Sequence, residues 1–120
     1  NSENLWISKE IRRELENIEK LTAPDGLGEI LHAAETLLKS CSTLFNISKK
    51  IDGTTAMAEQ AKVVKDNMLL LFGLINSGKA MSHSEEKFHS LQNEGVSLNH
   101  QVKGLIQSLT KVIEISNFFS

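Results

Sequence analysis

The length, composition and charge of this chain exclude several classes of protein. Its 120 residues are enough for one domain with a buried core, and a hydrophobic share of 40% argues against a disordered segment. The 13 basic and 15 acidic residues give a formal charge of -2, which offers no positive field to the phosphates of nucleic acid. We therefore expect a single domain, residues 1–120, that does not bind nucleic acid.

The single cysteine and the longest apolar run indicate a reducing compartment and no membrane crossing. Cys41 has no partner for an internal disulfide and lies among apolar residues, where a buried free thiol is the ordinary state. The longest apolar run, Met68 to Ile75, is far shorter than the roughly 20 residues that a helix needs to cross a membrane. We therefore expect a cytoplasmic protein that is not inserted in a membrane.

The first predicted helix covers residues 4–21. Charged residues separate its apolar positions, which recur at the spacing of one helix face. A turn is expected over residues 22–26, because this segment contains the only proline, Pro24, followed by Gly26. The inward residues of this helix are predicted to be Ile7, Ile11, Leu15 and Ile18.

The second predicted helix runs from residue 27 to residue 51. Asp52 and Gly53 end it, and Gly53 is free to adopt the left-handed conformation that closes many helices. The predicted inward stripe consists of Leu27, Leu31, Ala34, Leu38, Cys41, Phe45 and Ser48, and it is widened by Ile30, Leu37 and Leu44.

The third predicted helix covers residues 54–76. Its inward stripe consists of Met57, Ala61, Val64, Met68, Leu71 and Ile75. The segment 68–75 is nonetheless apolar on every side, and Leu69 and Leu70 fall opposite the stripe. Two interpretations stay open: the helix that follows covers these residues, or they form an exposed patch that binds another helix or a second copy of the chain.

The fourth predicted helix, residues 83–118, is the longest. At about 35 residues it would reach about 50 Å, well beyond the length of the other three. Either it bends at Gly95 or Gly104, or its final turns, 113–119, project to meet a neighbour. Its inward stripe consists of Phe88, Leu91, Gly95, Leu98, Val102, Leu105, Leu109 and Val112.

The connections between these four segments are short. Short connections make consecutive helices antiparallel neighbours. The sequence therefore predicts an all-α fold, an antiparallel up-down-up-down four-helix bundle with a long C-terminal helix.

Two Glu-x-x-His segments resemble the motif of di-iron carboxylate bundles. Glu29 and His32 form the first, and Glu86 and His89 form the second. Such a site takes this motif from two helices and a further Glu from each of the others. The phase of the inward stripes places all four side chains on outward faces, where they meet water instead of one another. We therefore expect no metal ion and no other cofactor.

The segment from His100 to Gly104 resembles the His-x-x-Lys-Gly signature of histidine phosphotransfer domains, which are small helical bundles. The resemblance implies that His100 accepts a phosphoryl group, that Lys103 supports its charge and that Gly104 leaves room for a response regulator. The four residues that follow, 105–108, lack the small side chains of that family. The alternative is an exposed helical histidine beside a lysine.

The second predicted helix resembles the vinculin-binding helices of talin-type rod bundles. Its pattern joins an aliphatic residue, a double alanine and apolar pairs one turn apart, at Ile30, Ala33, Ala34, Leu37, Leu38, Cys41, Leu44, Phe45 and Ser48. The resemblance implies an adhesion or cytoskeletal bundle in which this helix is packed at rest and is released to enter a partner's groove.

The function that these features favour is an interaction with another helix. An enzyme is not expected, because Cys41 would lie in the core, where burial leaves a thiol inert. The leading interpretation is a non-enzymatic protein-protein interaction module of a cytoplasmic scaffold, adhesion or cytoskeletal protein, which binds a partner helix through an apolar groove or patch. A histidine phosphotransfer domain is the alternative function, and a homodimer is an alternative partnership. The predicted contact residues are Leu69, Leu70, Phe72, Ala33, Leu37 and Leu44.

Overall fold

Four helices make up the described part of the chain, and it contains no strand. The structure, a computed structural model, describes the backbone of residues 2–50, 54–77 and 85–119, and the side chains of residues 9–50, 54–77 and 85–111. The helices are α1 (Ser2–Leu21), α2 (Pro24–Ser48), α3 (Thr54–Asn76) and α4 (Glu85–Phe119).

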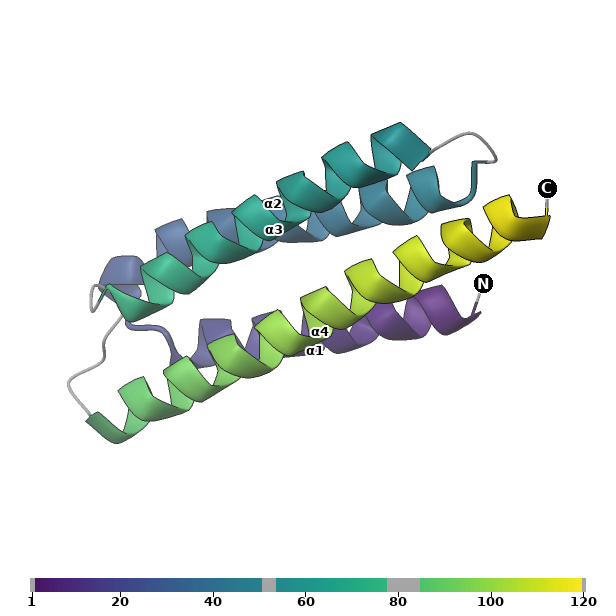
Figure 1. Cartoon of the computed structure of the whole chain (residues 1–120). Helices are drawn as coiled ribbons and strands as arrows, with labels where there is room; N and C mark the ends of the chain where they lie inside the picture. Colours follow the sequence, from purple (N-terminus) through teal and green to yellow (C-terminus); the bar gives the residue numbers. More distant parts are fainter. Residues whose placement is uncertain (1, 51–53, 78–84, 120) are drawn as a thin grey trace.

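The helices form an antiparallel up-down-up-down bundle, as predicted, with the longest helix at the C-terminal end (Figure 1). α2 lies along α3 and α1 lies along α4, and these two pairs face each other. α2 and α4 also approach each other across the middle, whereas in the described residues α1 and α3 do not. α3 is therefore flanked by α2 on one side and by α4 on the other.

The connection between α1 and α2 is shorter than the predicted turn over residues 22–26. Only Thr22 and Ala23 lie outside the helices, and the Thr22 hydroxyl donates a hydrogen bond to the carbonyl of Ile18 over 2.6 Å. The predicted start at residue 27 was wrong because Pro24 takes the first position of α2, where its missing N–H costs no hydrogen bond. α2 also ends at Ser48 instead of residue 51, and Gly53 lies outside the described residues.

The buried face of α2 is rotated from the predicted stripe by about one residue. Leu31 and Leu38 are only half-buried, while Leu37 is fully buried. α2 packs most extensively against α3, where the side-chain amide of Gln60 donates a hydrogen bond to the carbonyl of Ser40 over 3.1 Å. The buried residues of α2 are Gly26, Ile30, Ala33, Ala34, Leu37, Ser40, Cys41 and Leu44.

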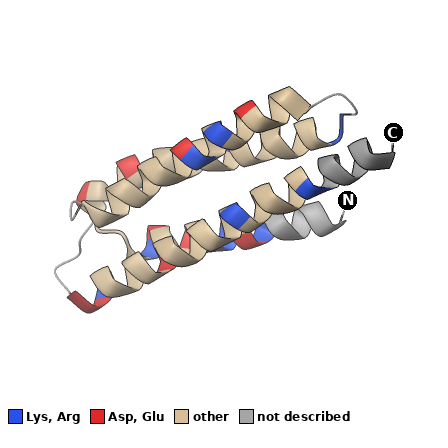
Figure 2. Ribbon diagram, in the orientation of Figure 1, with Lys and Arg blue, Asp and Glu red and all other residues tan. Residues whose placement is uncertain are grey.

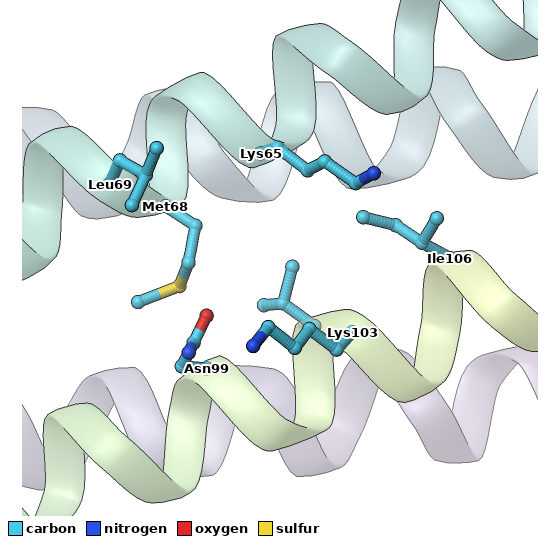
Figure 3. A pocket seen from close by; sticks show the side chains of 7 residues that line it. Lys65, Met68, Leu69, Asn99, Lys103 and Ile106 are labelled. Carbon is cyan, nitrogen blue, oxygen red and sulfur yellow. The ribbon is translucent and has the colours of Figure 1, made fainter.

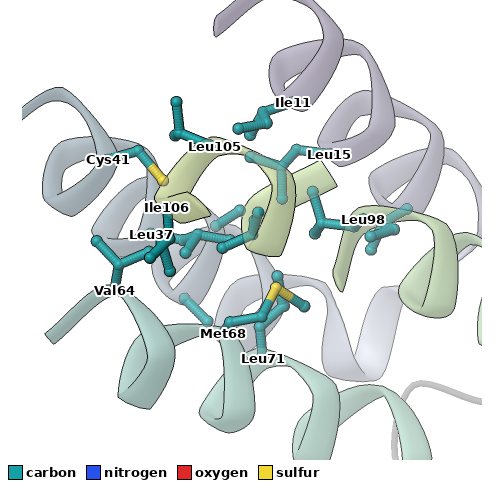
Figure 4. Packing of buried hydrophobic residues seen from close by; sticks show 14 of the residues in the cluster. Ile11, Leu15, Leu37, Cys41, Val64, Met68, Leu71, Leu98, Leu105 and Ile106 are labelled. Carbon is teal, nitrogen blue, oxygen red and sulfur yellow. The ribbon is translucent and has the colours of Figure 1, made fainter. Parts of the chain in front are cut away.

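Buried side chains from all four helices form one apolar cluster (Figure 4). The predicted stripe of α3 is confirmed, with Ala61 half-buried and the other five residues buried. In α4, the predicted residues from Leu91 to Leu109 are buried, Phe88 is half-buried, and the side chain of Val112 lies outside the described set. Ile106, which the predicted stripe lacks, is buried as well, because α4 faces both α1 and α3.

Gly95 marks the closest approach of α4 to α3. A Cβ atom at this position would lie 3.3 Å from Cδ1 of Ile75 and 3.5 Å from Cδ1 of Phe72. At Gly104, by contrast, nothing lies within 4 Å of the corresponding position. α4 runs as one continuous helix past both glycines (Figure 1), so neither interrupts it. The predicted role of the final turns, 113–119, concerns side chains outside the described set.

The same substitution is expected to stabilise the chain to different extents at the two glycines of α4. Gly104→Ala should raise the free energy of unfolding by up to about 1 kcal/mol, because alanine favours the helix and meets open space. Gly95→Ala should gain less, since Ile75 must shift to admit the methyl group. Urea denaturation of both variants measures the difference, and equal gains would contradict the close approach of α3 and α4.

Candidate functional site

The apolar run of α3 is divided between the core and the surface. Met68, Leu71 and Ile75 are buried, whereas Leu69 and Leu70 are 67% and 58% exposed. α4 packs beside this run and does not cover its outer side, so of the two open interpretations the structure supports exposure of both leucines and not their burial by the long helix. The segment therefore presents large apolar side chains to solvent.

The second half of α3 also carries no charge. Asp66 is its last charged residue, and Figure 2 shows the first half of α3 with both acidic and basic residues and the second half with neither. Phe72 is half-buried against the Gly95 position of α4, and Gly73 is exposed. We call Leu69, Leu70, Phe72 and Gly73 the α3 face. Apolar patches on folded proteins mark interaction sites more often than scattered single residues do.

A groove runs beside the α3 face, between α3 and α4 (Figure 3). Its volume is about 200 Å³, and its buried floor is made by Met68, Val102 and Ile106. A second hollow of about 300 Å³ shares Ile106 with it and extends to Gln107. The residues that line the groove are Lys65, Met68, Leu69, Asn99, Val102, Lys103 and Ile106. Leu69 belongs to both the groove and the α3 face, so the two form one continuous surface.

The predicted contact residues of α2, unlike those of α3, are buried in the core. Ala33, Leu37 and Leu44 are in the core, with exposed fractions of 3%, 0% and 0%. They have no free surface in the closed bundle, so a partner could reach them only if α2 left it. The resemblance of α2 to vinculin-binding helices stays a prediction.

The residues of the phosphotransfer alternative share the exposed side of α4. His100 and Gly104 are exposed, and Lys103 lines the groove. Exposure suits a phosphoryl acceptor, but it is equally the ordinary state of polar residues on an outward helix face. This interpretation also stays a prediction.

The other candidate reactive groups are dispersed or inert. Glu29, His32, Glu86 and His89 are all exposed, and among the described residues no three metal-ligating side chains come together. Cys41 is buried, as predicted, and burial raises the pKa of its thiol to about 12. Because the thiolate is the reactive form, this cysteine is not a nucleophile at neutral pH.

Two carboxyl groups, which were not predicted to pair, meet between α1 and α4. Glu14 and Glu94 are half-buried, and Glu14 Oε1 accepts a hydrogen bond from the Ser97 hydroxyl over 3.2 Å. With both groups ionised, Oε2 of each finds no donor among the described residues. The pKa of Glu94 rises to about 7, because its protonated form hydrogen-bonds to Glu14, because burial disfavours its charge and because Glu14 repels it, while a hydrogen bond with Asn17 lowers it.

The sequence does contain a signal for this pair. Each glutamate lies three residues after one core residue and four residues before another, Glu14 between Ile11 and Ile18 and Glu94 between Leu91 and Leu98. This spacing places a side chain on the inward edge of a helix.

In comparisons with protein-family models, with curated proteins and with solved structures, no match to this chain was found. Within the described residues, no helix combines the length and the apolar character that crossing a membrane requires.

Proposed function

We propose that this chain is a non-enzymatic interaction module that binds a partner helix on the α3 face. The observation that carries the proposal is the exposure of Leu69 and Leu70 within an uncharged stretch of α3. A helix laid in an apolar groove is a common mode of recognition between proteins. Gly73, which has open space beside it, would let the partner backbone come close.

The two exposed leucines of the α3 face would add substantially to the affinity for a partner. Burying a leucine side chain fully contributes about 1.5–3 kcal/mol, and both leucines are more than half exposed. Covering both would therefore contribute about 3 kcal/mol, which corresponds to roughly a 100-fold change in the dissociation constant. Met68 and Val102, in the floor of the groove, would add further contact to a side chain that enters it.

The proposal includes a setting for the module. The resemblance of α2 to helices of adhesion bundles favours a cytoplasmic scaffold, adhesion or cytoskeletal protein as the parent. Binding on the α3 face leaves the bundle closed, whereas the mode implied by that resemblance would open it. The two modes differ in which leucines become covered.

Replacing both Leu69 and Leu70 by aspartate should abolish partner capture and leave the bundle folded. Two carboxylates would stand where the partner's apolar side chains need an apolar surface, and neither position contributes to the core. The measurement combines a pull-down by the isolated chain with thermal melting followed by circular dichroism.

A matched control introduces the same charges elsewhere. Ser42 and Thr43 are adjacent exposed residues of α2, so Ser42→Asp with Thr43→Asp adds two carboxylates away from the α3 face. Partners retained by this variant and lost by the leucine variant support the proposal. If the leucine variant unfolds, or if it retains every partner, the proposal fails.

A further inference from the structure

The groove between α3 and α4 is positively charged although the whole chain is acidic. Lys65 and Lys103 line it from its two walls, and among the described residues none of its lining side chains is acidic. Asp66 follows Lys65 in sequence but does not line the groove. Neither lysine has a hydrogen bond or ion pair within the described part of the chain. Two ammonium groups therefore border the groove without an anion to neutralise them.

The two lysines lie toward opposite ends of the apolar floor. Figure 3 shows the Lys65 side chain extending along the α3 wall toward Ile106, and the Lys103 side chain extending along the α4 wall toward Asn99. Met68, Val102 and Ile106 form the apolar floor that the two lysines border. An occupant that matches the apolar floor and both lysines carries one apolar group flanked by two negative charges.

The shape of the surface favours an elongated occupant. The groove is open on its outer side, where Leu69 is mostly exposed, and it continues into the α3 face. A helix that places an apolar residue in the groove can extend along the α3 face and bury Leu70 too. The same helix can place carboxylates one turn to either side of that residue, at spacings of three or four positions.

We propose that the partner is an acidic amphipathic helix. One of its apolar side chains enters the groove, and glutamates or aspartates on the neighbouring turns pair with Lys65 and Lys103. This inference rests on the proposed function and adds the chemistry of the partner to it. Because charge pairs at an interface mainly set specificity and association rate, the lysines select among helices that the α3 face would otherwise bind alike.

The test uses two labelled helical peptides of about 18 residues, long enough to form a helix in water. Both carry leucine on one face, and the residues flanking the leucine stripe are glutamate in the first peptide and glutamine in the second. Fluorescence polarisation measures the affinity of each for the wild-type chain. We expect the glutamate peptide to bind roughly tenfold more tightly, and this preference to shrink as the salt concentration rises.

Charge reversal provides the matched variant. Lys65→Glu with Lys103→Glu should weaken binding of the glutamate peptide by roughly tenfold and leave the glutamine peptide within about twofold. A third peptide with lysine at the flanking positions should gain affinity for this variant. Both lysines are exposed, so the variant is expected to fold like the wild type, which circular dichroism checks.

The outcomes separate this inference from the proposed function. The glutamate and glutamine peptides could bind the wild type with equal affinity, bind Leu69→Asp more weakly and bind the charge-reversed variant unchanged. That result would overturn the acidic partner and still support binding on the α3 face. If no peptide binds the wild type, both proposals fall. If sedimentation shows a dimer of the chain that charge reversal dissociates, the occupant is a second copy and the acidic helix is overturned.

Discussion

Leu71→Ala is expected to lower the free energy of unfolding by about 2–5 kcal/mol, whereas Leu70→Ala should change it by less than about 0.5 kcal/mol. The two leucines are adjacent in α3, but Leu71 is fully buried and Leu70 is 58% exposed. Removing the Leu71 side chain leaves a cavity among core residues of several helices, while truncating Leu70 removes atoms that already meet water.

Urea denaturation at a single temperature measures both variants against the wild type. Both substitutions place alanine in the same helix, so their effect on helix propensity is the same and the difference reports packing alone. Equal losses for Leu70→Ala and Leu71→Ala would contradict the orientation of α3 in the bundle. Equal losses would also contradict the exposure of Leu70 and therefore the existence of the α3 face.

The free energy of unfolding is expected to fall as the pH rises from about 5 to about 8. The cause is the raised pKa of Glu94, which reaches about 7 in the folded chain against its ordinary value of 4.5. The stability that its proton provides is complete below the unfolded pKa and is lost as the pH rises through the folded value. Since the pair is still partly in contact with solvent, we expect this loss to be about 1 kcal/mol.

Glu94→Gln should remove this loss of stability. Its amide can donate a hydrogen bond to Glu14 without carrying a charge, so the variant has no proton to lose at this position. Glu16→Gln, at an exposed position of α1, serves as the control for the titration of other groups. Denaturation of the three proteins across the pH range provides the measurement. A Glu94→Gln curve parallel to the wild type would show that the two carboxyl groups do not share a proton.

The helix faces that could be predicted from the sequence are those with strict apolar spacing. In α4 and the first half of α3, polar residues separate the apolar positions at regular intervals, so a single phase fits. α2 has apolar residues on a broad arc, so its sequence fits several phases, and only its packing against the other helices decides that Leu37 is buried more deeply than Leu38. Its start was misplaced because Pro24 suits both a turn and the first residue of a helix.

From the sequence, the exposure of the α3 face could be predicted only as one of two alternatives, the other being burial by the following helix. A stretch that is apolar on every side shows that some residues lie outside the core stripe, but the position of α4 determines whether they are covered. The lysine-bordered groove and the pairing of the two carboxyl groups could not be predicted, although the spacing of each glutamate places it on the inward edge of its own helix. Each combines residues of two helices that are distant in sequence, Lys65 with Lys103 and Glu14 with Glu94, and so depends on the register between them.

The central claim is that a partner helix covers the α3 face of a closed bundle. Methyl NMR of the chain with leucine methyl groups labelled, titrated with the glutamate peptide, tests it directly. We predict shifts of the methyl resonances of Leu69 and Leu70, while those of Leu37 and Leu44, buried in α2, keep their positions. Shifts at Leu37 and Leu44 with Leu69 and Leu70 unchanged would contradict the claim, because they would place the partner on the core face of an opened α2.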